Sequence, residues 1–215
     1  MKNIKNKIID VAGKLEKPQK RMEELNMSPY SDEHKQEKLN EFMEEFKNEI
    51  GESFNEIKDQ LAKNKQQYQD KIQDLNSGDY DKRAYYYQKA KAESDNYDNL
   101  TEFIKNKADS AADDIEKMES NKVALEKARA GQGDLELIKA EITKNLPDKE
   151  YQARKELKKY DIYEDNIKGA ESAVMNDLDK IKQGNYGTTR KVLISYSQDD
   201  GIDQKAEKKI HETIK

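Results

Sequence analysis

The sequence predicts an all-α protein: a long antiparallel helical hairpin that a third helix extends to a three-helix, coiled-coil-like bundle. Three observations support this fold class. Charged residues make up 40% of the 215 residues and apolar residues only 33%, against about 25% and 45–50% in average soluble domains. There are only nine Gly and three Pro, so long stretches run without a helix breaker. Apolar residues recur at helical spacing, which suits a stripe along long helices better than one large core.

The first long helix is expected over residues 31–76, a segment without Pro in which Gly51 is the only Gly. Its apolar residues recur every eleven residues, or about 3.67 residues per turn, which suits a straight or slightly right-handed bundle. We expect one buried stripe along this helix. Its members are Leu39, Phe46, Ile50, Ile57, Leu61, Tyr68 and Ile72.

The second long helix is expected over residues 79–130, which contain neither Gly nor Pro. Its apolar residues repeat every seven residues, with Ala90, Tyr97 and Ile104 at one heptad position. The two helices have similar lengths and a short connection, so we expect an antiparallel hairpin. Their different periods weigh against a uniform two-stranded coiled coil and favour a third partner.

Two further helices, over residues 134–146 and 148–183, are expected to supply that third partner. Pro147 separates them, because Pro breaks or kinks a helix. Apolar residues at seven-residue spacing form a stripe along the second of these helices, but Glu164 and Glu171 interrupt it. The two glutamates mark a narrow contact or an exposed face of the helix; the alternative is a partner-binding surface.

The sequence divides into an N-terminal amphipathic segment (residues 1–30), a long-helix bundle (31–183) and a C-terminal docking segment (184–215). Within the last of these, residues 190–196 are strand-like and residues 202–214 have the apolar face of a helix. A lone strand is unstable in water. The tail therefore either docks on a partner chain or folds back to close its own bundle.

Tyrosine is the one unusual enrichment, with twelve residues. Three consecutive tyrosines at 85–87 point in three directions on a helix, so at most two can enter one seam. Exposed tyrosine is typical of binding surfaces; the alternative is aromatic packing at the end of the bundle. Together with the tail, this segment gives the candidate partner-binding residues, which are Val192, Leu193, Ile194, Ile202, Ile210, Ile214, Tyr85 and Tyr86.

No residues are predicted to be catalytic, to bind a cofactor or to ligate a metal. The chain has no Cys, and its two histidines, His34 and His211, have no neighbouring ligand set. The acidic segments lack the spacing of a calcium loop. Phosphate-loop and serine-nucleophile motifs are also absent. We therefore expect neither an enzyme nor a bound cofactor.

The charge distribution makes nucleic acid an unexpected partner. The net charge is −5, and an acidic body opposes contact with phosphates. No stretch approaches 18 apolar residues, so no membrane span is expected. The absence of Cys fits a reducing compartment, and we expect the protein in the cytoplasm of a bacterial host cell or in a virion.

These features favour a non-catalytic structural or assembly protein whose partners are proteins, itself or a larger assembly. The abundance of Lys, Asn, Ile, Asp and Tyr is typical of an A+T-rich coding sequence. The narrower expectation is therefore a bacteriophage virion or capsid-assembly component that is head-interior, scaffold-like or connector-associated. The alternative is an acidic helical inhibitor or regulator of a host enzyme. Residues 31–77, with 12 acidic and 7 basic residues, would then mimic nucleic-acid charge.

Overall fold

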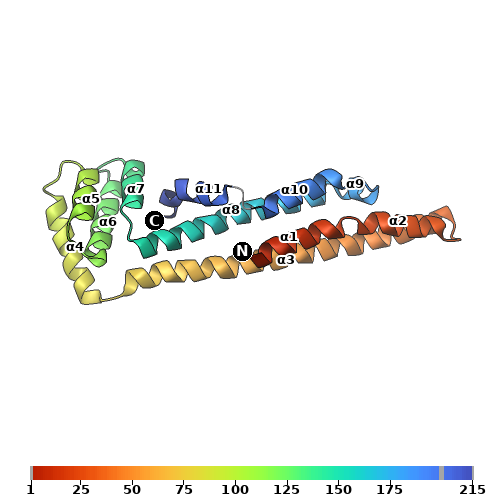
Figure 1. The fold of residues 1–215 in the computed structure, drawn as a ribbon, viewed down its shortest axis with the longest axis horizontal. Helices are drawn as coiled ribbons and strands as arrows, with labels where there is room; N and C mark the ends of the chain where they lie inside the picture. Colours follow the sequence, from red (N-terminus) through yellow and green to blue (C-terminus); the bar gives the residue numbers. More distant parts are fainter. Residues whose placement is uncertain (1, 199–200, 215) are drawn as a thin grey trace. The chain divides into compact units, whose positions relative to one another are not determined.

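The computed structural model describes residues 2–198 and 201–214, and helices are the only regular secondary structure in this part of the chain. The all-α fold class is therefore confirmed. Figure 1 shows the order of the helices along the chain. No described helix is long and apolar enough to cross a lipid bilayer.

The chain forms two compact units, each built from segments that are distant in sequence. The first unit comprises residues 1–64 and 160–201, and the second comprises residues 65–159 and 202–215. Two helices, α3 and α8, contribute residues to both units. The units therefore differ from the three consecutive segments into which the sequence alone divides the chain.

The first unit packs its terminal helices along α3 and α8. Lys7 pairs with Glu56 at 2.6 Å and joins α1 to α3, and Lys58 pairs with Glu171 at 2.6 Å and joins α3 to α8. Helix α10 lies against α1, and α9 lies against α2. The elements of this unit are α1 (Lys2–Lys14), α2 (Lys17–Met27), the first part of α3 (Asp32–Ser77), the last part of α8 (Asp148–Asn176), α9 (Leu178–Lys182) and α10 (Gly187–Ser197).

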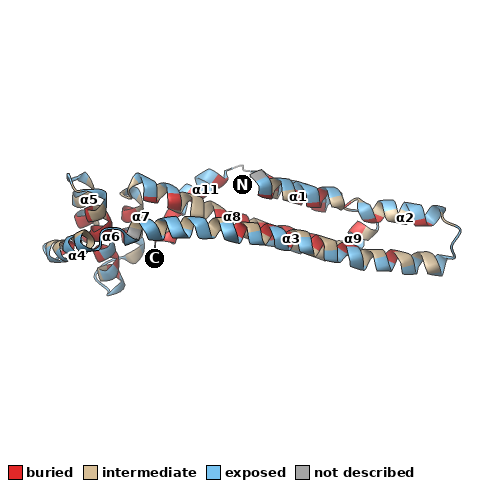
Figure 2. Ribbon diagram, turned by 90° about the horizontal axis from the view of Figure 1, so that it is seen from below, coloured by how far each residue is buried: buried red, intermediate tan, exposed pale blue. Residues whose placement is uncertain are grey.

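A buried stripe follows α3 through the first unit, as the eleven-residue repeat predicts (Figure 2). Phe54, which widens this stripe, is fully buried as well. Tyr68 and Ile72 are half-buried and belong to the part of α3 in the second unit. The buried members of the repeat are Leu39, Phe46, Ile50, Ile57 and Leu61.

The second unit has a core of its own around α6. This helix packs against α4, α5 and α7, and α7 also contacts the 3-10 helix η1. Phe103, Ile104, Val123 and Ala124 lie at the centre of the core. The elements are the last part of α3, α4 (Tyr80–Ser94), α5 (Leu100–Asp109), α6 (Asp114–Arg129), α7 (Leu135–Lys144), the first part of α8, α11 (Ile202–Lys208) and η1 (Ile210–Thr213).

A single helix over residues 79–130 is wrong, because the segment folds into the three helices α4, α5 and α6. Two side chains cap the new helix starts. Asn99 accepts a 2.9 Å hydrogen bond from the amide of Thr101, and Asp113 accepts one of 2.9 Å from the amide of Glu116. Such caps satisfy amides that have no partner in the first turn. Three short helices therefore replace the second arm of the expected hairpin.

The strand expected over residues 190–196 is also wrong, because this segment lies within α10. A single strand would leave backbone groups without partners, whereas a helix pairs its own backbone groups. The helix buries Thr189, Leu193 and Ser197 on one face. Thr189 donates a 2.7 Å hydrogen bond from Oγ1 to Asp177. The helix expected over residues 202–214 is present as α11 followed by η1.

Candidate functional site

Most of the tail residues predicted to bind a partner are buried within the chain. In the first unit, Leu193 is fully buried and Val192 half-buried, while Ile194 is 38% exposed. The remaining tail residues belong to the second unit. All of them are at most 5% exposed: Ile202, Ile210 and Ile214. The structure therefore divides these residues between two cores and does not gather them on one docking surface.

Polar contacts hold the end of the tail on α8 in the second unit. Lys159 of α8 pairs with Asp203 of α11 at 2.5 Å. Arg154 of α8 donates a 2.6 Å hydrogen bond from Nη1 to the carbonyl of Thr213 in η1. Two more pairs join the same elements: Lys155 with Glu207 and Lys158 with Glu212. These contacts match the second interpretation of the tail, in which it closes its own bundle.

Tyrosines of α4 remain at the surface. Tyr80 is 83% exposed and Tyr85 is 63% exposed. Tyr86 is half-buried, and its hydroxyl lies 3.4 Å from a carboxylate oxygen of Asp113. The rings of Tyr85 and Tyr86 meet edge to face at 5.3 Å. Of the predicted partner-binding residues, Tyr85 is thus the most accessible.

Tyr85 belongs to a larger exposed surface, which we name the α4 face. At about 100° per residue, its members lie within an arc of about 140° around the helix. Two of them, Ala84 and Ala92, are small. Neither Asp81 nor Lys91 forms an ion pair with any described residue. The α4 face consists of Tyr80, Asp81, Ala84, Tyr85, Gln88, Lys91 and Ala92, all of which are exposed.

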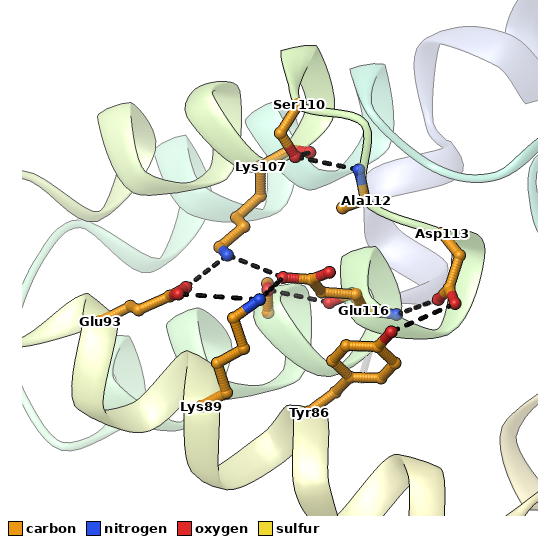
Figure 3. Close-up of polar contacts among 9 residues, drawn as sticks. Tyr86, Lys89, Glu93, Lys107, Ser110, Ala112, Asp113 and Glu116 are labelled. Carbon is orange, nitrogen blue, oxygen red and sulfur yellow. Dashed lines mark hydrogen bonds and ion pairs between the residues drawn. The ribbon is translucent and has the colours of Figure 1, made fainter.

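The opposite side of α4 is fixed by an ionic cluster (Figure 3). Glu116 of α6 is 8% exposed. It accepts one hydrogen bond of 2.9 Å from Lys89 of α4 and another of 2.9 Å from Lys107 of α5. Lys107 also pairs with Glu93 of α4. The cluster thus joins three helices and leaves the α4 face outward.

The cluster keeps its buried groups charged near neutral pH. Burial raises the pKa of Glu116, but the hydrogen bonds from Lys107 and Lys89 outweigh it, so the pKa lies below its ordinary value of 4.5. For Lys107, burial lowers the pKa, but the hydrogen bonds to Glu93 and Glu116 outweigh it and raise the pKa above 10.5. The charges are therefore retained as partners of one another.

Other features of the α4 face could not be anticipated from a straight helix over residues 79–130. The heptad pattern of this expected helix assigns Ala90 to the buried seam, and Ala90 is buried in the structure. The pattern does not single out Asp81, Ala84 or Lys91. The cap residues Asn99 and Asp113 are the signal in the sequence that would have predicted a shorter helix.

Within the described residues, no group of three or more His, Cys, Asp or Glu is arranged to hold a metal ion.

Comparisons with known proteins give no relative from which a role could be transferred. No protein-family model, no curated protein and no solved structure matches the chain. The exposed α4 face and the ionic cluster behind it are therefore the features of the molecule that bear on its function.

Proposed function

We propose that the protein is a non-catalytic assembly component that acts through protein–protein contacts, and that its α4 face binds the α4 face of a second copy. The observation that carries this proposal is the self-complementary pattern of that face. Asp81 lies near its N-terminal end and Lys91 near its C-terminal end, about 15 Å apart along the helix. Small and aromatic residues occupy the surface between and around them.

A two-fold symmetric contact brings the same surface of both copies together. In one antiparallel register of two α4 helices, Asp81 of one copy faces Lys91 of the other. The same register places Tyr80 opposite Ala92 and Ala84 opposite Gln88. Small residues at the contact let the helix axes approach closely. Every charged residue on the face then has an opposite charge across the contact.

We expect this contact to be weak and concentration dependent. Exposed ion pairs contribute about 0–1 kcal/mol each, and the face is smaller than the roughly 20–30 residues per side of a standard interface. Tyrosine supplies most of the apolar area, since an aromatic residue buries about 150–250 Å². Weak contacts become strong when many copies engage together, which suits a component of a large assembly.

The narrower proposal remains a bacteriophage virion or capsid-assembly component in a bacterial host cell or a virion. It is supported by the residue usage typical of A+T-rich coding sequences and by long helices that leave an outward face free for assembly. Burial of the tail in the two cores weighs against the tail as a docking arm and moves the proposed contact to α4.

Sedimentation velocity over a range of protein concentrations tests this proposal. The wild-type mass should rise above that of the 25.0 kDa monomer as concentration increases. Ala84→Glu introduces a larger charged residue at the centre of the face and should keep the protein monomeric. The matched control is Ala62→Glu, at an exposed alanine of α3, which should behave as the wild type. A monomer at every wild-type concentration, or equal association of both variants, would contradict the proposal.

One observation favours the alternative of an acidic inhibitor or regulator. Exposed carboxylates follow one side of α3 at Glu33, Glu37 and Glu41, and a four-residue step on a helix is about 6 Å. Lys38 pairs with Glu41 at 2.8 Å and reduces this charge. A stable 1:1 complex with a nucleic-acid-processing enzyme, lost in Glu33→Gln/Glu37→Gln, would support mimicry over assembly.

A further inference from the structure

The second unit contains a cavity of about 300 Å³ that is separate from the α4 face. It lies among α4, α6, α7, α8 and the end of the chain after η1. One part of its wall is apolar and includes Leu125, Ile142 and Ile214. The polar part contains Arg83, Glu119, Asn121, Lys122, Glu126, Arg129, Glu150 and Arg154.

Two buried Arg–Glu pairs line this one cavity. The side chains of Arg83 and Glu119 are 12% and 5% exposed. Those of Arg154 and Glu150 are 12% and 6% exposed, with 2.6 Å between Nη2 and the carboxylate. Burying charges is costly unless they are paired and hydrogen bonded. Replacing such pairs by apolar residues of similar volume is often neutral or stabilising, so these pairs point to a role for the polar wall beyond closing the core.

Hydrogen-bond donors on this wall lack partners among the described residues. Asn121 is only 9% exposed, and its Nδ2 has no hydrogen-bond partner in the part of the chain that the structure describes. Buried amide groups are rarely left unpaired in native proteins. The guanidinium of Arg154 has five N–H donors, of which Glu150 and Thr213 receive three hydrogen bonds. Acceptor atoms placed in the cavity would satisfy the remaining donors of Arg154. They would satisfy Nδ2 of Asn121 once this amide turns toward the cavity, because the atom itself is buried in the observed orientation.

The lining also has a net positive charge. Its cationic side chains are Arg83, Lys122, Arg129 and Arg154, and its carboxylates are Glu119, Glu126 and Glu150. Free donors with a net positive charge favour an anion. The apolar wall favours a ligand whose anionic group is attached to a hydrocarbon body.

We propose that this cavity binds a small organic carboxylate. The carboxylate accepts hydrogen bonds from Asn121 and Arg154, and the hydrocarbon body packs against Ile142 and Ile214. At about 30 Å³ per water molecule, the cavity holds the volume of about ten waters, which sets the ligand near ten non-hydrogen atoms. The inference does not depend on self-association through α4.

Titration calorimetry of the full chain with 3-phenylpropionate tests the proposal, because this carboxylate has the expected size and polarity. Its neutral match is 3-phenylpropanamide, and inorganic phosphate is the anion without a hydrocarbon body. We expect 3-phenylpropionate to bind. The dissociation constants of 3-phenylpropanamide and inorganic phosphate should be at least about tenfold higher, because the loss of one charge-assisted hydrogen bond changes affinity by about this factor. No binding of 3-phenylpropionate, or equal binding of either match, would overturn the proposal.

Variants locate the binding. Asn121→Leu removes the free amide at similar volume, so it should weaken binding about tenfold while thermal melting stays equal or rises. Asn106→Leu, at an exposed position of α5, is the matched control and should bind as the wild type. If Asn121→Leu does not fold, Lys122→Gln at the exposed rim should still weaken binding. Unchanged affinity in Asn121→Leu would place the ligand elsewhere and overturn the proposal. If Asn121→Leu does not fold, unchanged affinity in Lys122→Gln would overturn it.

Discussion

Arg154 donates a 2.6 Å hydrogen bond to the backbone carbonyl of Thr213 and so ties η1 to α8. Carbonyl groups at the end of a helix have no donor within the helix, and a charged donor gives a stronger bond than a neutral one. Ile210 and Ile214, on either side of this bond, are 0% and 5% exposed. The end of the chain is thus part of the core of the second unit.

Truncation of Ile210 should destabilise the protein, because the side chain is fully buried. Ile210→Ala should lower the free energy of unfolding by about 2–5 kcal/mol, as measured by urea unfolding followed by circular dichroism. Lys208→Ala, at an exposed position two residues earlier, should change it by less than about 0.5 kcal/mol. Similar effects of the two substitutions would mean that η1 does not close the core.

The buried stripe of α3 makes a parallel prediction for the first unit. Leu61 is 3% exposed, so Leu61→Ala should cost about 2–5 kcal/mol of unfolding free energy. Lys63 lies on the exposed side of the same helix, and Lys63→Ala should leave thermal melting nearly unchanged. A melting temperature that falls equally in both variants would show that the stripe has been assigned to the wrong side.

The ionic cluster predicts a dependence on acid. The pKa of Glu116 is lower in the folded protein than its ordinary value of 4.5, which applies to the unfolded chain. The ionised carboxylate therefore stabilises the fold fully above about pH 4.5. This stabilisation is lost as the pH falls through the lower pKa of the folded protein. At neutral pH, Glu116→Gln should cost about 1–3 kcal/mol. Unfolding free energies should show this difference shrinking below about pH 4.5. Parallel pH profiles for wild type and variant would argue against a charged Glu116.

Tyr85 should contribute to self-association more than a tyrosine elsewhere. Tyr85 lies at the edge of the α4 face, and truncating an interface tyrosine there costs up to about 1–2 kcal/mol, so Tyr85→Ala should raise the dimer dissociation constant by up to about tenfold. Tyr30 is 51% exposed in the first unit, and Tyr30→Ala is the comparison. Sedimentation equilibrium measures both. An unchanged constant for Tyr85→Ala would remove this residue from the contact.

The sequence predicts the helical fold class and most of the core because both depend on local periodicity. The members of the eleven-residue repeat between Leu39 and Leu61 are buried, as the repeat predicts. The apolar residues Ile4 and Ile8, spaced four apart, form part of the buried face of α1. Periodicity does not reveal where a helix ends, since the heptad pattern continues through the turns around Asn99 and Asp113. Side-chain caps at these residues compete with the continuous helix and prevail.

Tertiary packing decides the elements that the sequence predicts wrongly. Val192 and Ile194 have the β-branched character of a strand, but Leu193 and Thr189 find buried positions when the segment is helical. The Glu119 partner of Arg83 and the Thr213 partner of Arg154 are equally beyond local pattern, because they lie 36 and 59 residues away along the chain. Such long-range pairs depend on the fold and cannot be read from spacing.

Reversing the two charges of the α4 face tests self-association through this surface most directly. Asp81→Lys and Lys91→Asp should each place like charges together twice in a symmetric dimer, and each should raise the dissociation constant about tenfold. The double variant Asp81→Lys/Lys91→Asp restores both pairs, so its sedimentation-equilibrium constant should return to the wild-type value. A double variant that associates no better than the single variants would contradict the antiparallel α4 contact.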